Sequence, residues 1–370
     1  MAPMRTDGVA VVGVGSTAIV RRTDRSLLAI ACEAAVAALG DAGIGPEDVD
    51  GYIGTPVAPN PSAAHADGVD EVSGALLQRT LGLAPVWSAD LVAMSATAVV
   101  AAAQALRSGD CRYVLVVRVI GNPPGVYSAT SNLDAAGAAQ FGLPYGYGAA
   151  WARHALWWAR YMHDHGATRE DLFSVVGTGR RHAQLNPLAY WKGTELTLPQ
   201  YLAAPWVCEP LSIFDCDIPV TGAVAFVMTT AALAGGHDHP AHLVGGVSNA
   251  DPAGVFARAG VAPAEVDVAQ LYDGFASFVP MWLERLGFAE TGGAVPFMRD
   301  RGIGLDGALP VNTFGGSLGE GRLHGAGHVR EAVLQATGRA GERQLPNVRH
   351  SLVLVGIPET ATALLFSGDA

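Results

Sequence analysis

Two short polar segments in the C-terminal part of the chain carry side chains suited to chemistry. One is LYDGF at residues 271–275, which places Tyr272 and Asp273 directly after an apolar run. The other is VNTFGG at residues 311–316, which contains Asn312. A tyrosine, with an ordinary pKa of about 10, acts as a base only where cations or hydrogen-bond donors stabilise its phenolate. We therefore regard Tyr272 as a proton-transfer candidate that requires a neighbouring cation.

Each of these side chains also has a structural role open to it. A tyrosine at the end of a strand commonly packs in the core, and Asp273 can accept hydrogen bonds from backbone amides at a strand-to-helix turn. Asn312 either shapes its glycine-rich loop or donates to an oxyanion, and Gly316 belongs to the same loop. We keep Asn312 and Gly316 as candidates for an oxyanion or substrate site.

Ser95 and a pair of histidines offer two further kinds of chemistry. Ser95 lies in residues 94–106, which are apolar on all sides and predict a buried central helix. A serine needs an adjacent base to act as a nucleophile, so packing or helix capping is the competing interpretation. His324 and His328 have the i, i+4 spacing of helical metal ligands, but the local sequence supplies no cysteine or carboxylate to complete a set. We predict site-lining or helix-capping histidines and no metal.

Composition restricts the class of protein. The 370 residues are enough for two packed halves, and the net charge of −11 disfavours a nucleic-acid partner. Four cysteines without a CxxC pair indicate neither a disulfide framework nor a cysteine metal site. The longest apolar run is shorter than the roughly 20 residues that span a bilayer. With no secretory signal at its start, the sequence predicts a cytoplasmic protein without a membrane segment.

An internal repeat organises the chain. AGIGPEDVD at residues 42–50 closely resembles AGVAPAEVD at residues 259–267. Each copy has the pattern of a helix end, a glycine cap, a proline turn and the entry to a strand. The matching positions of the two copies favour duplication of a half.

The elements between the repeats alternate as in α/β proteins. We expect a helix at residues 27–39, capped by Asp24 or Ser26, and strands at residues 9–14, 113–119, 223–230 and 351–355. Residues 113–119 look like a continuous apolar strand that is covered on both faces. Aromatic residues and histidines concentrate between residues 121 and 210, which we interpret as an inserted loop or lid domain. The predicted division is residues 1–120 with 211–235, the insert at 121–210, and a second half at 240–370.

Several motifs in combination resemble sterol-carrier-protein-type thiolases. They are FGLPYG at 141–146, GATRED at 166–171, RHA at 181–183, LYDGF at 271–275 where those proteins carry His-Asp-Cys-Phe, and VNTFGG with Gly325. The resemblance covers nearly the whole chain. It implies the α/β thiolase fold, in which two similar βαβαβαββ halves form α-β-α-β-α layers with an inserted loop domain.

Three reactive groups of thiolases are absent from the matching positions. The nucleophilic cysteine, at the start of the central helix, would fall near Val92, and residues 91–98 contain no cysteine. The histidine of the Gly-His-Pro base corresponds to Arg322, with His324 two residues away. A second cysteine would fall near Leu354. The resemblance therefore argues against Claisen condensation through an acyl-enzyme.

One branch of the superfamily shows a similar exchange. The lipid-transfer-protein-like aldolases of steroid side-chain degradation lack the cysteine and carry tyrosine before Asp-Cys-Phe, which Tyr272-Asp273 resembles. They cleave β-hydroxyacyl-CoA thioesters to a ketone and a shorter acyl-CoA. The step needs a base for the β-hydroxyl proton and donors for the enolate oxygen. A second tyrosine usually stands where this chain has Arg322, which cannot be a base but can stabilise a phenolate or enolate, or hold a CoA phosphate.

The resemblance thus implies a retro-aldol or aldol carbon-carbon lyase that acts on a bulky, steroid-like or other β-hydroxyacyl-CoA. The candidate catalytic residues are Tyr272, Asp273, Arg322 and His324, and those for the substrate or oxyanion are Asn312, Ser95 and Gly316. Coenzyme A is expected as part of the substrate, with no tightly bound cofactor. A homodimer and an OB-fold/zinc-ribbon partner protein are also implied. The alternatives are an acyltransferase that uses Ser95 or a partner's nucleophile, and a non-catalytic acyl-CoA-binding subunit.

Overall fold

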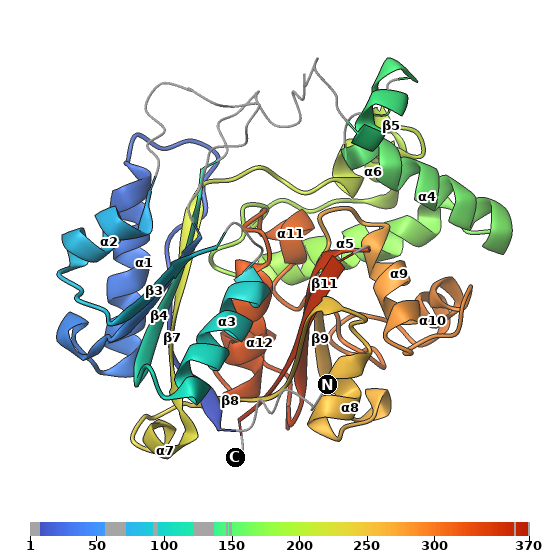
Figure 1. The fold of residues 1–370 in the computed structure, drawn as a ribbon. Coiled ribbons are helices and arrows are strands. Elements are labelled where there is room, and N and C mark those ends of the chain that lie inside the picture. The colour runs from blue at the N-terminus through green and yellow to red at the C-terminus, as the bar shows by residue number, and fades with distance from the viewer. Residues whose placement is uncertain are drawn as a thin grey trace.

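Two similar β-sheet halves with helices between and outside them form the framework of the protein (Figure 1). The computed structural model describes residues 8–55, 72–91, 95–121, 137–145, 147, 150–358 and 360–368. The first half has strands β1 (Val9–Ser16), β2 (Gly51–Thr55), β3 (Trp87–Asp90), β4 (Tyr113–Ile120) and β7 (Gly222–Thr230). The second has β8 (Ala241–Ala250), β9 (Val268–Leu271), β10 (Ser351–Ile357) and β11 (Thr360–Ser367).

The strand order repeats in the two halves. The hydrogen-bonded order is β3-β2-β4-β7-β1-β8-β11-β10-β9, with the two halves joined where Ala10 and Val11 of β1 meet β8. Read outward from this junction, β1-β7-β4-β2 corresponds to β8-β11-β10-β9. Val311 forms a parallel bridge to Ala269 of β9, in the place that β3 takes beside β2. The duplication predicted from the repeat is therefore visible in the topology.

Helices form three layers around the sheets (Figure 1). The central layer holds α3 (Ser95–Ser108) and α12 (Ala326–Ala336), and outer helices are α1 (Leu27–Ala42), α2 (Gly74–Leu81), α8 (Gly254–Ala259), α9 (Phe278–Arg285) and α10 (Ala294–Asp300). Alanines dominate the buried positions of α3, so both sheets can approach it closely. The predicted buried central helix and the α-β-α-β-α order are confirmed. So are the strands predicted from apolar runs and the helix over residues 27–39, which Ser26 caps through a hydrogen bond from the amide of Ala29.

The two copies of the repeat have the same local structure. Helix α1 ends at Gly43 with φ 68°, and α8 ends at Gly260 with φ 69°, a left-handed conformation that suits glycine. Short 3₁₀ helices, η1 (Pro46–Asp48) and η6 (Pro263–Glu265), follow. The carboxylate of Asp50 accepts from backbone amides at the entry to β4, and that of Asp267 from amides at the entry to β10. The repeat thus encodes the turn that feeds each half's parallel strand pair.

One charged residue lies inside the buried strand β4. The strand is buried throughout, but Arg118 interrupts the apolar run with a guanidinium on a side chain only 7% exposed. The strand is covered on both faces, as predicted for residues 113–119, with one charged side chain inside it. A charge in this position requires polar partners, because an isolated buried ion is costly.

Residues 150–215 lie over one end of the sheets (Figure 1). They contain α4 (Ala150–His165), α5 (Arg169–Leu185), α6 (Leu198–Leu202), β5 (Trp206–Cys208), β6 (Leu211–Ser212) and η5 (Ile213–Asp215). Short 3₁₀ turns η3 (Gly137–Phe141) and η4 (Leu143–Tyr145) precede them, α7 (Ala231–Ala234) follows β7, and α11 (Gly316–Gly319) and η7 (Gly341–Arg343) flank α12 in sequence.

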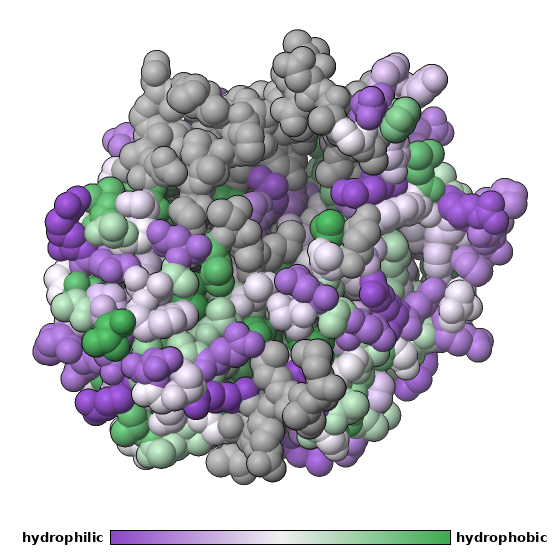
Figure 2. Space-filling model, in the orientation of Figure 1, coloured by the Kyte–Doolittle hydropathy of each residue, from purple (hydrophilic) through white to green (hydrophobic). Residues whose placement is uncertain are grey.

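On the face shown in Figure 2, hydrophilic side chains cover both flanks, over α1 and α2 on one side and over α4 on the other. Within the described ranges, no helix combines the length and apolar character needed to cross a bilayer.

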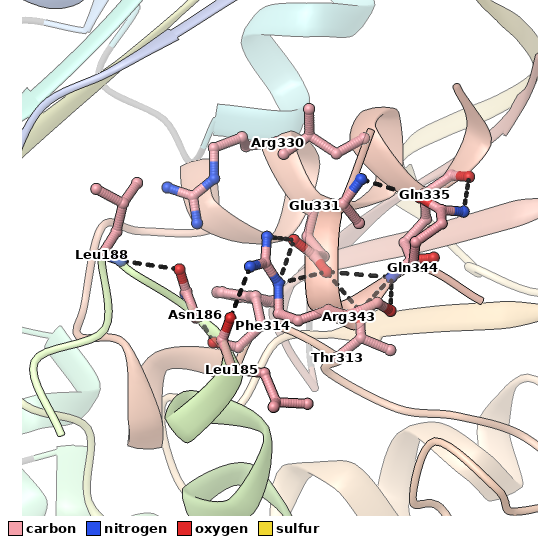
Figure 3. A network of polar contacts seen from close by, with 12 residues as sticks. Leu185, Asn186, Leu188, Thr313, Phe314, Arg330, Glu331, Gln335, Arg343 and Gln344 are labelled. Atoms are coloured by element: carbon pink, nitrogen blue, oxygen red, sulfur yellow. Dashed lines mark hydrogen bonds and ion pairs between the residues drawn. The ribbon is translucent and has the colours of Figure 1, made fainter. Parts of the chain in front are cut away.

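A buried polar network joins α5 to the loops of the second half (Figure 3). The carboxylate of Glu331 accepts from Thr313 at 2.7 Å, from Gln335 at 3.2 Å and from Nη2 of Arg343 at 3.0 Å. Arg343 also donates to the carbonyl of Leu185 at the end of α5. The network therefore holds the loop that contains Asn312 against both α5 and α12.

Replacing Glu331 by glutamine is expected to lower the free energy of unfolding by about 3–5 kcal/mol, because it leaves the buried charge of Arg343 without its counter-ion. Urea denaturation followed by circular dichroism measures the change. Glu342→Gln, an exposed glutamate beside the network, is the matched control and should alter stability by less than about 0.5 kcal/mol. Equal losses in the two variants would contradict this account of the network.

Candidate active site

Tyr272 lies at the end of β9, fixed on both sides through its backbone. Its amide donates to the carbonyl of Leu354 in β10 at 2.9 Å, and its carbonyl accepts from Nε1 of Trp282 at 2.9 Å. The side chain is 4% exposed, and its ring centroid lies 5.5 Å from that of His328. The tyrosine is therefore held in a single buried position between the sheet and α12.

Asp273 connects β9 to two helices. Its carboxylate accepts from the amides of Ser317 at 2.7 Å and Leu318 at 3.4 Å, at the start of α11, and from Nε2 of His328 at 2.9 Å. Gly316 has φ 67°, and a Cβ there would lie 2.0 Å from Oδ2 of Asp273. The observed bonds are those of the structural alternative for Asp273, and they explain why residue 316 is glycine. Chemical roles for these two residues stay predictions.

Asn312 extends the edge of β9 with its side chain. Its Oδ1 accepts from the amide of Leu271 at 2.7 Å, and its Nδ2 donates to the carbonyl of Leu271 at 2.8 Å. The residue adopts φ 51°, which asparagine tolerates better than most side chains. Its own carbonyl lies 3.0 Å from Nδ1 of His182 in α5. These bonds correspond to the loop-shaping alternative, and an oxyanion role for Asn312 stays a prediction.

Two arginines, one aspartate and Tyr272 form a buried charged group. The amide of Arg322 donates to the carbonyl of Ile218 at 2.8 Å, and Nε of Arg322 lies 3.9 Å from Oδ2 of Asp217. Burial and the nearby Asp217 raise the pKa of Tyr272 well above its usual value, although Arg322 and Arg118 oppose the shift. The phenol therefore keeps its proton near neutral pH. In this state the phenol can donate a hydrogen bond or a proton, and the catalytic role of Tyr272 stays a prediction.

His324 faces Arg118 from the loop before α12. Helix α12 begins only after Gly325, and His324 has φ 49°, so the i, i+4 spacing of His324 and His328 does not put both residues on one helical face. Nη2 of Arg118 is hydrogen-bonded to Nδ1 of His324. Because a guanidinium can only donate, Nδ1 must be unprotonated and Nε2 carries the proton. Burial and the two arginines hold the pKa of His324 well below its ordinary value, so the neutral ring presents an Nε2–H donor.

Ser95 ties the starts of the two central helices together. Its amide and its hydroxyl both donate to the carbonyl of His324, each at 3.2 Å. The serine proton is thus directed to a carbonyl rather than to a base. Val92, the position predicted to match the thiolase cysteine, lies outside the described residues.

A cavity of about 440 Å³ opens beside this group. Its walls are mostly aromatic and apolar, and they come from residues 150–219 together with Phe275, Leu318 and Arg21. Asp217, the carboxylate of the charged group, lines the cavity together with the thiol of Cys216. The part of the chain that the structure describes holds no cluster of three or more metal-ligating His, Cys, Asp or Glu side chains.

Comparison with known proteins identifies the family. Residues 240–364 match the model of the thiolase C-terminal domain-like family. A 17-hydroxy-3-oxo-4-pregnene-20-carboxyl-CoA lyase from Mycobacterium tuberculosis is 31% identical, over 98% of this chain and 100% of its own. A steroid side-chain-cleaving aldolase from Thermomonospora curvata is 30% identical, over 97% and 98%. The chain belongs to the thiolase-like aldolase family. A solved structure, the Ltp2-ChsH2(DUF35) aldolase, superposes with a TM-score of 0.87 at 29% identity over 98% of each chain.

Membership in the thiolase-like aldolases confirms the fold and the branch predicted from the motifs. Sequence reasoning missed Arg118, Asp217 and His328 as parts of the group around Tyr272. Arg118 had a usable signal, because it is the one charged residue in an apolar strand. Asp217 had none, since an isolated aspartate in a loop resembles many solvated ones. His328 was noticed for its spacing, whereas its actual partner is Asp273.

His154 supplies a test of how the aldolase fold packs α4 against this region. Its ring lies 4.5 Å from those of Phe275 and Phe278 between centroids, and burial lowers its pKa to about 4. In the unfolded chain the pKa is about 6.5, so below that pH the unfolded state binds a proton that the folded state excludes. The contribution of neutral His154 to the free energy of unfolding is therefore fully present above about pH 6.5, and it is lost as the pH falls toward 4.

We expect His154→Phe to lose about 2 kcal/mol less unfolding free energy than the unmodified protein when the pH drops from 7 to 5. Urea denaturation at the two pH values measures this difference. His163→Phe, at an exposed position of the same helix, should leave the pH dependence unchanged. A His154→Phe variant with the pH dependence of the unmodified protein would show that His154 titrates normally in the fold.

Proposed function

We propose that this protein cleaves the Cα–Cβ bond of a bulky β-hydroxyacyl-CoA thioester by a retro-aldol step, without an acyl-enzyme. The observation that carries the proposal is the buried phenol of Tyr272, which feels the charges of Asp217, Arg322 and Arg118, next to an apolar cavity that Asp217 lines. Such a group is suited to stabilising an oxyanion and delivering a proton. The names of the relatives from Mycobacterium tuberculosis and Thermomonospora curvata support the same reaction class.

The residues divide the work of the step as follows. The carboxylate of Asp217, which lines the cavity, takes the proton of the β-hydroxyl, and the electrons of the Cα–Cβ bond move onto the thioester as an enolate. The Nε2–H of His324 donates to the enolate oxygen, and the charges of Arg118 and Arg322 stabilise it. Tyr272 then gives its proton to Cα, which yields the shorter acyl-CoA, and regains a proton from Asp217. The β-carbon leaves as a ketone.

Covalent chemistry has no activated nucleophile among the described residues of the site. The thiol of Cys216 lines the cavity, but burial together with Asp217 and Asp215 raises its pKa well above the ordinary value. A protonated thiol is a poor nucleophile. The hydroxyl of Ser95 donates to the carbonyl of His324 rather than to a base. The aldolase reading is therefore favoured over the acyltransferase that uses Ser95.

We also propose that coenzyme A carries the acyl group of the substrate. The name of the lyase from Mycobacterium tuberculosis, which includes a carboxyl-CoA, supports this. Arg21, half-buried on the cavity wall, provides a cation for a carrier phosphate. We also infer a partner protein, since the neighbour named Ltp2-ChsH2(DUF35) pairs two components. We infer a homodimer as well, which is supported by the position of β3 at the edge of the sheet, next to Val86 with 77% of its surface exposed.

Tyr272→Phe is expected to reduce ketone release from a β-hydroxyacyl-CoA by about 10²–10⁴-fold, because it removes the hydroxyl that donates the proton and keeps the aromatic ring. Coupled assay of the ketone and liquid chromatography of the shorter acyl-CoA both measure turnover. Tyr113→Phe is the matched control, since Tyr113 bonds to His237 away from the site; its turnover should stay unchanged. Full turnover by Tyr272→Phe would remove Tyr272 from the mechanism.

Incubation with the acyl-CoA should leave the mass of the intact chain unchanged, because no acyl-enzyme forms. Mass spectrometry after rapid acid quench tests this, with Ser95→Ala and Cys216→Ala as comparisons. A covalent adduct that disappears in either variant would favour the acyltransferase alternative. Binding of acyl-CoA without any turnover, in the presence of the partner as well, would favour a non-catalytic subunit.

A further inference from the structure

Arg180 is a buried cation on the wall of the 440 Å³ cavity that has no acidic partner among the described residues. Its side chain, in α5, is 4% exposed. The guanidinium donates from Nη1 to the carbonyl of Thr194 at 3.4 Å, and Nε has no hydrogen-bond partner in the described part of the chain. A buried charge without a counter-ion is costly unless a ligand neutralises it and accepts its hydrogen bonds.

Two aromatic rings fix the guanidinium in place. Its central carbon lies 4.0 Å from the ring centroid of Trp191 and 5.7 Å from that of Phe214, and both rings also line the cavity. Stacking of this kind occupies the faces of the guanidinium and leaves its edge donors for a ligand. Arg180 is thus positioned before any ligand arrives, so little side-chain entropy would be lost on binding.

The rest of the cavity selects for an apolar body. Trp151, Tyr190 and Phe275 add further aromatic walls, and the volume lies in the range that encloses a ligand of several fused rings. Asp217, the one acidic side chain of the described lining, lies 3.9 Å from Nε of Arg322, with which it pairs. Arg21 also lines the cavity but is partly solvated. An anion inside the cavity would therefore meet Arg180 as the cation least compensated by the protein.

We propose that the cavity binds the acyl group as a rigid alicyclic skeleton that bears a carboxylate, and that Arg180 recognises this carboxylate. The inference rests on the proposed function, because it assigns the substrate class of the same site. It differs from the neutral 3-oxo group in the name of the lyase from Mycobacterium tuberculosis. A carboxylate matches the planar donor edge of arginine and neutralises its charge, whereas a ketone accepts a hydrogen bond only.

The test measures binding, which does not depend on turnover. Isothermal titration of the full chain at pH 7 with decalin-2-carboxylate and with its neutral carboxamide gives the preference for the charged ligand. We expect the carboxylate to bind about tenfold more tightly, in line with the greater strength of charge-assisted hydrogen bonds. Arg180→Gln should abolish this preference, and Arg180→Lys should retain part of it because it keeps the charge. Arg181→Gln, the exposed neighbouring arginine, is the matched control and should keep the full preference.

Three results would overturn the proposal. They are equal affinity for the two ligands in the unmodified protein, an unchanged preference in Arg180→Gln, and a loss of affinity for CoA alone in that variant, which would assign Arg180 to the carrier. Thermal melting of each variant establishes that it is folded before titration. If the lyase reaction itself fails but the carboxylate preference holds and follows Arg180, the cavity assignment stands and the proposed chemistry falls.

Discussion

The carboxylate of Asp273 is the interaction on which the geometry of the site depends. It joins the end of β9 to the first amides of α11 and to His328 of α12, so three separate segments meet at one buried side chain. Because the preceding residue is Tyr272, the same bonds determine where the phenol sits. If Asp273 lost these donors, its buried carboxylate would be left without hydrogen bonds at the full cost of its desolvation. Other positions of the Asp273 side chain are therefore disfavoured.

The cations around Tyr272 change the charge balance of a thiolase-like site. In a cysteine enzyme, positive groups and a helix start stabilise a thiolate. Here Arg118 and Arg322 act electrostatically on the buried phenol of Tyr272, the neutral ring of His324 contacts Arg118, and the negative charge lies on Asp217, 3.9 Å from Arg322. The positive potential is thus available to a negative charge that develops on the substrate rather than on the protein.

Local chemistry explains what the sequence could predict. The repeat at residues 42–50 and 259–267 combines a glycine cap, a proline turn and an aspartate, and each acts within a few residues or at the adjacent strand. Tyr272, Asp273 and Asn312 could be located because they follow a strand or lie in a glycine-rich loop. Contacts across the fold could not be predicted: Arg118 meets His324 over 206 positions of sequence. The left-handed backbone of His324, just before α12, likewise has no signal in the local sequence.

The bonds of Asn312 run to main-chain atoms of Leu271, and those of Asp273 run partly to main-chain amides of α11. Every residue type except proline offers the same main-chain groups, so these bonds do not depend on which side chains project into the site. A lineage could therefore exchange a cysteine or histidine for tyrosine or arginine while the scaffold beneath stayed in register. The same main-chain scaffold can therefore serve enzymes that form carbon-carbon bonds and enzymes that break them, with substitutions at only a few side chains that face the site.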